Sequence, residues 1–149
     1  MVDVSGKPAT RREATASAFV SLSAEVLTAL PNNPKGNPLE IARIAGIQAA
    51  KRTSDLVPLC RPMLVGSVQV NFTIGDDFVE VEAQVETFDR TGVEMESLTA
   101  CAVAALTVYD MCKSADKTMV IGELCLWEKT GGSAGAWRRP DESQDGSGS

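Results

Sequence analysis

The sequence predicts an α+β fold in which an antiparallel sheet carries helices packed on one face. Residues 78–88 alternate between apolar side chains and acids or glutamine, the two-residue period of a strand with one face in water. Residues 92–112 are apolar around nearly the whole circumference of a helix, which predicts a long helix buried on several sides. Two strand patterns joined by a short turn, with helical patterns before and after them, are also typical of the α+β class.

A short strand and two helices open the predicted order. Residues 17–22 form the strand, and Ser23 caps a helix over residues 24–30 that Pro31 ends. A second helix over residues 39 to about 52 has apolar side chains at helical spacing. Cations at its C-terminal end suit the helix dipole.

A hairpin, the long helix and a last strand follow. Residues 65–74 and 78–88 are the two strands of the hairpin, because a Gly-Asp-Asp turn separates them. The long helix over residues 92–112 precedes a last strand over residues 118–127. This order of strands and helices is that of a ferredoxin-like antiparallel sheet with its helices on one face.

Length and charge limit the classes of protein that the chain can belong to. The 149 residues suit one domain over residues 1–139, and the polar segment 140–149 has too few apolar residues to order itself. A net charge of −6 argues against a general nucleic-acid binder, which needs a basic surface. No apolar run is long enough to span a bilayer and the first residues do not form a signal peptide, so we expect a cytoplasmic protein.

The chain has four cysteines and no histidine. The cysteines are widely spaced in apolar surroundings, which predicts free thiols in a reducing compartment rather than a zinc site or a disulfide framework: Cys60, Cys101, Cys112 and Cys125. The missing histidine excludes Ser-His-Asp and Cys-His nucleophiles. Proton transfer must therefore use carboxylates, lysine, tyrosine or thiols, and we expect no metal site.

Ionisable residues lie at both ends of the apolar helix. Glu94 and Glu96 fall in its first turn, where the helix dipole favours negative charge. Asp110 and Lys113 fall in its last turn, three positions apart on one face. A lysine at the edge of a dry pocket loses proton affinity, and a nearby carboxylate restores part of it, so the pair is a candidate for proton transfer near neutral pH. The alternative is an ordinary ion pair worth about 0.3 to 0.5 kcal/mol.

Five motifs occur in an order that matches one known family. They are M-V-D-V-S-G-K at residues 1–7, R-I-A-G-I-Q-A-A-K-R-T at 43–53, L-V-P-L-C-R-P at 56–62, the helix motif at 91–113 and M-V-I-G at 119–122. With these motifs the chain resembles the cyclic pyranopterin monophosphate synthase family of molybdenum cofactor biosynthesis. The resemblance covers the chain up to about Gly135.

The resemblance implies the same ferredoxin-like fold and a lyase activity. The family's reaction converts (8S)-3′,8-cyclo-7,8-dihydroguanosine 5′-triphosphate, a cyclic dihydro-GTP, into cyclic pyranopterin monophosphate and releases pyrophosphate. Its substrate needs cations for the phosphates and proton donors and acceptors for the ring. The resemblance also implies a homohexamer, a trimer of dimers with sites at subunit interfaces. We expect no cofactor, although Mg²⁺ on the triphosphate is compatible with the chemistry.

The resemblance also assigns roles to individual residues. It makes Asp110, Lys113 and Lys51 catalytic candidates, whereas composition alone makes Lys51 part of a solvated helix end. The implied substrate-binding residues are Lys35, Cys60, Arg61, Glu94, Met95, Glu96 and Lys129. In isolation, Lys35 and Lys129 are ordinary surface lysines, and the two glutamates only complement the helix dipole. Side chains two positions apart on a helix point about 200° apart. Only one of the two glutamates can therefore face a given pocket, unless the chain at this position has not yet become helical.

Three positions depart from the family pattern. Arg61 stands where the family has an active-site histidine, Ser133 replaces a lysine, and Asn37 replaces an aspartate. Arginine can bind phosphate bidentately but cannot exchange a proton near neutral pH. The alternative to an active lyase is therefore a nucleotide-binding homologue that Arg61 has impaired, and which serves as a binding or regulatory subunit.

Overall fold

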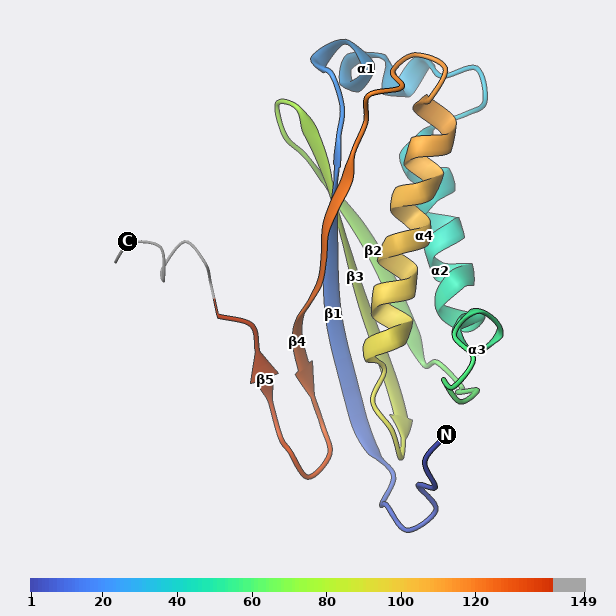
Figure 1. Ribbon diagram of the computed structural model, residues 1–149, viewed down its shortest axis with the longest axis vertical. Coiled ribbons are helices and arrows are strands. Elements are labelled where there is room, and N and C mark those ends of the chain that lie inside the picture. The colour runs from blue at the N-terminus through green and yellow to red at the C-terminus, as the bar shows by residue number, and fades with distance from the viewer. Residues whose placement is uncertain (141–149) are drawn as a thin grey trace.

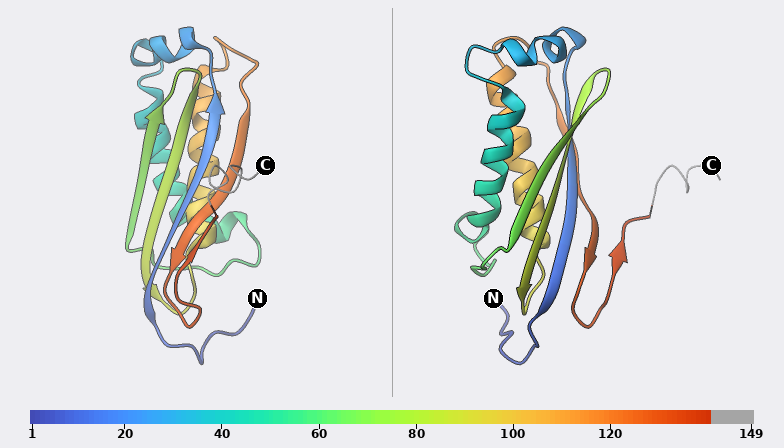
Figure 2. Two further views of the ribbon diagram at one scale, coloured as in Figure 1. Left: turned by 90° about the vertical axis from the view of Figure 1, so that its left-hand side faces the viewer. Right: turned by 180° about the vertical axis from the view of Figure 1, so that it is seen from behind.

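The strands and helices of the computed structural model, which describes residues 1–140, form two layers (Figures 1 and 2). The strands are β1 (Thr10–Ser21), β2 (Ser67–Ile74), β3 (Phe78–Asp89), β4 (Ile121–Thr130) and β5 (Trp137–Arg138). The helices are α1 (Ala24–Ala29), the 3₁₀ turn η1 (Leu30–Asn32), α2 (Pro38–Lys51), α3 (Thr53–Leu56) and α4 (Glu94–Cys112). The sheet order is β2-β3-β1-β4-β5, with every neighbouring pair antiparallel. Together these confirm the ferredoxin-like class.

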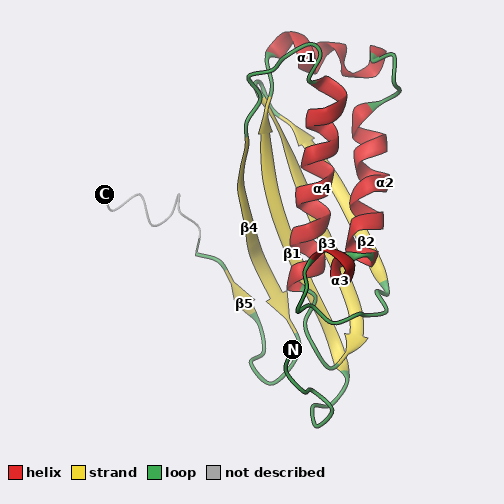
Figure 3. Ribbon diagram, turned by 45° about the vertical axis from the view of Figure 1, so that its right-hand side comes forward, coloured by secondary structure: helices red, strands yellow, loops and turns green. Residues whose placement is uncertain are grey.

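Both long helices, α2 and α4, cover the same face of the sheet (Figure 3). The core between the layers is made of small apolar side chains at alternate positions of the two central strands: Ala14, Ala16, Ala18 and Val20 on β1, and Val79, Val81, Ala83 and Val85 on β3. α4 closes this layer with Ala100, Cys101, Ala104 and Val108. At Gly46 on α2, a Cβ atom would lie 3.1 Å from the carbonyl oxygen of Ala100, so glycine permits the close helix contact.

Two helix starts are set by side chains. The Ser23 hydroxyl accepts a hydrogen bond from the Val26 N–H at 3.3 Å, which confirms the predicted cap. The Asn37 side-chain oxygen accepts from the Leu39 N–H at 3.0 Å and begins α2. An aspartate could accept the same bond, so the departure at position 37 preserves the cap.

Several boundaries differ from the sequence prediction. β1 begins at Thr10 rather than at residue 17, because its first half also pairs with β3 and β4. The sequence did not show this half because its buried side chains are alanines, which are weak strand signals. Helical structure continues past Pro31 as η1, since a proline fits the first turn. β4 runs from Ile121 to Thr130, three residues later than predicted, and α3 and β5 were not predicted.

α4 is not buried on all sides within one chain. Leu106 is 58% exposed and Met95 is 40% exposed, on the side away from the sheet. Ile44 on the neighbouring α2 is also exposed. The expected burial of the apolar helix therefore needs something outside this chain.

Arg43 joins α2 to the outer strand β2. Its guanidinium donates to the carbonyl oxygen of Val70 and, at 3.3 Å, to the side-chain oxygen of Asn71. The same group lies 5.6 Å from the ring centre of Phe72. These contacts fix the side chain across strand β2.

Two other sequence-based expectations concern the chain as a whole. Most of the tail predicted to be disordered, residues 141–149, lies outside the described residues. Among residues 1–140, none of the helices combines the length and apolar character that crossing a bilayer requires.

Candidate active site

The predicted site residues fall into two groups at opposite ends of α4. The first group, at the amino end, contains Cys60, Arg61, Glu94, Met95, Glu96 and Lys129. The second group, at the carboxyl end, contains Lys35, Asp110 and Lys113. About 24 Å along the helix axis separates Glu94 from Asp110 at 1.5 Å per residue. One chain therefore does not bring all the predicted residues together.

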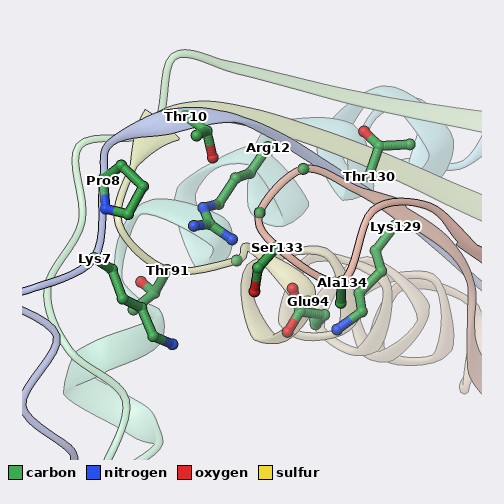
Figure 4. Close-up of a pocket in the computed structure, with 13 residues that line it drawn as sticks. Lys7, Pro8, Thr10, Arg12, Thr91, Glu94, Lys129, Thr130, Ser133 and Ala134 are labelled. Carbon is green, nitrogen blue, oxygen red and sulfur yellow. The ribbon is translucent and has the colours of Figure 1, made fainter.

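A cavity of about 600 Å³ lies at the amino end of α4, between the start of β1 and the loop after β4. Lys7, Arg12 and Lys129 line it, and Glu94 enters from the helix. Figure 4 shows these four side chains directed toward one shared space, with Ser133 at its edge. Three cations against one carboxylate make the cavity suited to a polyanion.

Glycines allow the loop after β4 to close over β1. Gly131 and Gly132 have φ angles of 102° and 79°, in the region that favours glycine. A Cβ atom on Gly131 would overlap the Arg11 carbonyl oxygen, and one on Gly132 would overlap the Arg12 guanidinium. The Arg12 Nε also donates to the carbonyl oxygen of Asp89 at 3.0 Å, which fixes this cation at the cavity wall.

A second cavity of about 360 Å³ adjoins the first. It shares Lys7, Thr91, Gly92 and Glu94 with the larger cavity. Its own lining includes Met1, Leu59, Cys60, Arg61, Met95 and Glu96. The two cavities form one trough. Arg12 and Lys129 line only its larger end, Glu96 and Arg61 line only its smaller end, and Lys7 and Glu94 lie where the two meet.

Glu96 is the most deeply buried acid of the trough. The residue is 3% exposed, and its Oε2 accepts a hydrogen bond from the Cys60 thiol at 3.5 Å. Burial raises the pKa of Glu96, while its own backbone N–H and the thiol act against this. Burial, and then the nearby Glu96 charge, raise the pKa of Cys60 to about 11. Cys60 is therefore a protonated hydrogen-bond donor near neutral pH.

Glu94 and Glu96 line the same cavity although they are two positions apart. Val93, the residue before α4, has φ −118° and ψ 27°, and Glu94 is the first helical residue. The turn is only beginning at Glu94, so its side chain is free to fold back over Gly92. The 200° separation expected within a helix therefore does not keep these two side chains apart, because the helix is only beginning at Glu94.

Asp110 and Lys113 form an ion pair at 2.9 Å, but the pair is in water. Lys113 is 55% exposed and Asp110 is 64% exposed. The ion pair raises the pKa of Lys113 and lowers the pKa of Asp110. The expectation of a lysine with reduced proton affinity is wrong for the single chain, because no dry surface covers it there.

The remaining predicted lysines lie near one end or the other. Lys35 lines a cavity of about 190 Å³ with Met111 and Ser114, beside Asp110. Lys51 is exposed as the last residue of α2, which ends beside α3 toward the amino end of α4 (Figure 1). Lys51 lines none of the cavities described here within residues 1–140.

The trough contains residues that were not predicted. Lys7 belongs to the first motif and Arg12 to the Arg-Arg pair of β1, and both line the larger cavity. The Arg90 Nε holds the segment in place by donating to the carbonyl oxygen of Lys7 at 3.0 Å. No spacing in the sequence pairs Arg12 with Lys129, because the antiparallel contact of β1 with β4 brings them together. Over residues 1–140, no cluster of three or more possible metal ligands occurs.

Comparisons with known proteins agree on one family. A sequence model described as the MoaC family matches residues 1–132. The cyclic pyranopterin monophosphate synthase of Streptomyces avermitilis is 55% identical over 141 residues, covering 93% of this chain and 83% of the relative. The same-named protein of Thermomicrobium roseum is 52% identical over 146 residues, covering 95% and 88%. A molybdenum cofactor biosynthesis bifunctional protein of Chlorobaculum tepidum is 52% identical over 91% of this chain and 44% of the relative.

Proposed function

This chain belongs to the MoaC family, and on that premise we propose that it is a cyclic pyranopterin monophosphate synthase, a lyase of molybdenum cofactor biosynthesis. Its substrate is the GTP-derived (8S)-3′,8-cyclo-7,8-dihydroguanosine 5′-triphosphate, and its products are cyclic pyranopterin monophosphate and pyrophosphate. The observation that carries this proposal is the continuous trough at the amino end of α4.

The trough suits such a substrate at both ends. Lys7, Arg12 and Lys129 supply charge-assisted hydrogen bonds for the triphosphate, and a polyanion offsets their mutual repulsion. At the other end, Glu94 and Glu96 can accept from the amino group and ring N–H of the guanine-derived part. Arg12 and Lys129 line only the larger cavity and Glu96 lines only the smaller one, so the two ends differ and favour one direction of the substrate along the trough.

The proton-transfer groups come from the second group of residues. Asp110 and Lys113 remain the catalytic candidates, with Lys51 as a third, because the ring rearrangement needs a donor and an acceptor. In one chain Asp110 lies about 24 Å along the helix from Glu94, whereas Lys51, the last residue of α2, lies toward the amino end of α4. We therefore propose a site shared between copies, in which one chain supplies the trough and another supplies Asp110 and Lys113.

A homo-oligomer, a hexamer built as a trimer of dimers, follows as a proposal. The exposed apolar side chains of the helix layer, Leu106, Met95 and Ile44, support it, because burial against another copy would remove them from water. Covering the Asp110–Lys113 pair in the same contact would desolvate it and bring the pKa of the lysine down. Gel filtration at the mass of a single chain would contradict this proposal.

Arg61 lines the carboxylate end of the trough rather than the cation end. The hydrogen bonds from Ser5 lower the pKa of Asp3 most, burial opposes them, and the positive charge of Arg61 adds the smallest effect, a further lowering. A permanent cation here can donate to an oxygen of the substrate but cannot take up a proton. Comparing Arg61→His with the wild-type protein measures what that exchange costs: a large gain in kcat at similar KM would mean that arginine limits turnover.

The proposal includes no resident cofactor, with Mg²⁺ entering only on the triphosphate. The four free thiols, of Cys60, Cys101, Cys112 and Cys125, support a reducing compartment such as the cytoplasm.

The deciding experiment is a single-turnover incubation of the purified protein with the cyclic dihydro-GTP, following pyrophosphate and the pterin product. We expect both products in equal amounts, and expect Asp110→Ala to abolish both while the circular dichroism spectrum is unchanged. Substrate binding in calorimetry without product would contradict the lyase assignment.

A further inference from the structure

Cys60 and Glu96 meet inside the trough, from segments 36 residues apart in the sequence. The thiol donates to Glu96 Oε2 at 3.5 Å, and within residues 1–140 its one other acceptor contact is a long 4.0 Å approach to the Arg61 carbonyl oxygen. Glu96 is 3% exposed and has no cation within salt-bridge distance among residues 1–140. The thiol is therefore the side-chain donor that stabilises the charge of this buried carboxylate.

From this contact we infer that Cys60 is a positioning residue, whose thiol keeps Glu96 ionised and oriented as a hydrogen-bond acceptor for the ring of the substrate. The inference rests on the proposed function, which supplies the ring with its amino and N–H donors. It assigns Cys60 an indirect role: the thiol acts on the carboxylate, and the carboxylate acts on the substrate.

Direct chemistry by Cys60 does not fit its surroundings. A nucleophilic or proton-accepting cysteine needs a thiolate, which cations and helix N-termini favour. Here the charged groups that act on the thiol are Glu96 and Glu94, and burial, followed by Glu96, raises the pKa of Cys60 to about 11. At pH 7 roughly one thiol in ten thousand is ionised at such a pKa.

The charged groups that face Glu96 come from three segments. Glu94 on the same helix raises the pKa of Glu96, after the larger effect of burial. Lys7 and the Met1 amino group line the cavity from the N-terminal segment, and Arg61 lines it beside the thiol. The groups that lower the pKa of Glu96 are its own backbone N–H and the Cys60 thiol, so removal of the thiol should raise that pKa without abolishing the titration.

The first test is the pH dependence of kcat/KM in Cys60→Ala, Cys60→Ser and the control Cys125→Ala. Without the thiol the pKa of Glu96 should rise further, so Cys60→Ala should lose kcat/KM at acid pH by about tenfold for each unit of pKa shift. The loss should appear mainly in KM and should disappear at alkaline pH, where Glu96 is ionised in every variant. Cys60→Ser retains a donor and should lie closer to the wild type, and Cys125→Ala, a half-buried cysteine outside the trough, should match it.

The second test does not use activity. Because Glu96 raises the pKa of the thiol, Glu96→Gln should lower that pKa and speed the alkylation of Cys60 by iodoacetamide, measured by mass spectrometry of the peptide that contains it. Glu80→Gln, on β3 outside the trough, is the matched control and should leave the rate unchanged. An equal rate in Glu96→Gln and the wild type would overturn the contact itself.

The outcomes separate this inference from the proposed function. A pH-independent loss in Cys60→Ala, or a profile that overlays the wild type, would overturn the positioning role while the enzyme remains a synthase. If the wild-type protein releases no pyrophosphate, the proposed function fails, and this inference fails with it.

Discussion

Two variants that are each inactive should recover activity when they assemble into one oligomer. Glu96→Gln damages the trough at the amino end of α4, and Asp110→Asn damages the pair at the carboxyl end. If each site takes its trough from one copy and its pair from another, a mixed oligomer contains some sites in which both parts are intact. If a single chain supplied both parts, every site would contain one defect.

The expected recovery follows from random assembly. In an equal mixture, half of the copies offer an intact trough and half offer an intact pair, so about one quarter of the shared sites are complete. A change of shape in one chain is a weak alternative to a shared site, because Glu94 and Asp110 lie on one continuous helix and about 24 Å apart along its axis. Bending a chain to bring them together would break α4.

The assay co-expresses the two variants with different affinity tags, purifies the oligomers that carry both tags, and measures pyrophosphate release per site. A matched control combines Asp110→Asn with Lys113→Ala. Both of these variants damage the pair and leave the trough intact, so their mixture should stay inactive. Mixed Glu96→Gln and Asp110→Asn oligomers without activity, beside an active wild-type oligomer with the same two tags, would refute the shared site.

Three further predictions concern stability and phosphate binding. Asn37→Ala removes the cap of α2 and should lower the free energy of unfolding by about 1 kcal/mol in urea titrations, whereas Asn37→Asp should not; an unchanged alanine variant would contradict the cap. Gly132→Ala forces a Cβ atom against the Arg12 guanidinium at a φ of 79°, so substrate affinity measured by calorimetry should fall while the fold persists. Unchanged affinity would show that Arg12 does not bind the phosphates. Ser133→Lys adds a cation to the lining of the larger cavity, so KM should fall and should depend more steeply on salt concentration. A KM that changes neither with the substitution nor with salt would show that the phosphates do not bind in that cavity.

The sequence predicted the elements in which the alternation of apolar and polar residues follows the alternation of buried and exposed positions. The strand at residues 78–88 was visible because each buried apolar residue has a polar neighbour that faces the open side of the sheet. The first half of β1 was missed, since its buried positions are Ala14 and Ala16 and its other positions include two arginines, a composition that also suits a loop. β5 consists of two residues and pairs only with β4, so no periodicity could reveal it.

The motifs proposed candidate site residues, but they do not describe how those residues are arranged in space. The motifs pointed to the acids at the two ends of α4, yet they contain no information that the pair at Asp110 is exposed in one chain. Arg12 was missed because its neighbour Lys129 is more than a hundred residues away and is brought close by the pairing of β1 with β4. Lys7 was missed because it precedes β1, where no periodic pattern places it beside the cavity. Whether the two ends of α4 cooperate is a property of the assembly, which is not encoded in any local pattern.

The Arg43 contact on β2 limits how copies of this protein can associate. An outer strand offers unpaired backbone groups to any extended peptide, including the same strand of another molecule, and this is the usual route to fibrils. Here a guanidinium already occupies the Val70 carbonyl oxygen in the middle of that strand, and its side chain obstructs an incoming backbone. Growth of the sheet by strand addition along β2 is thereby disfavoured.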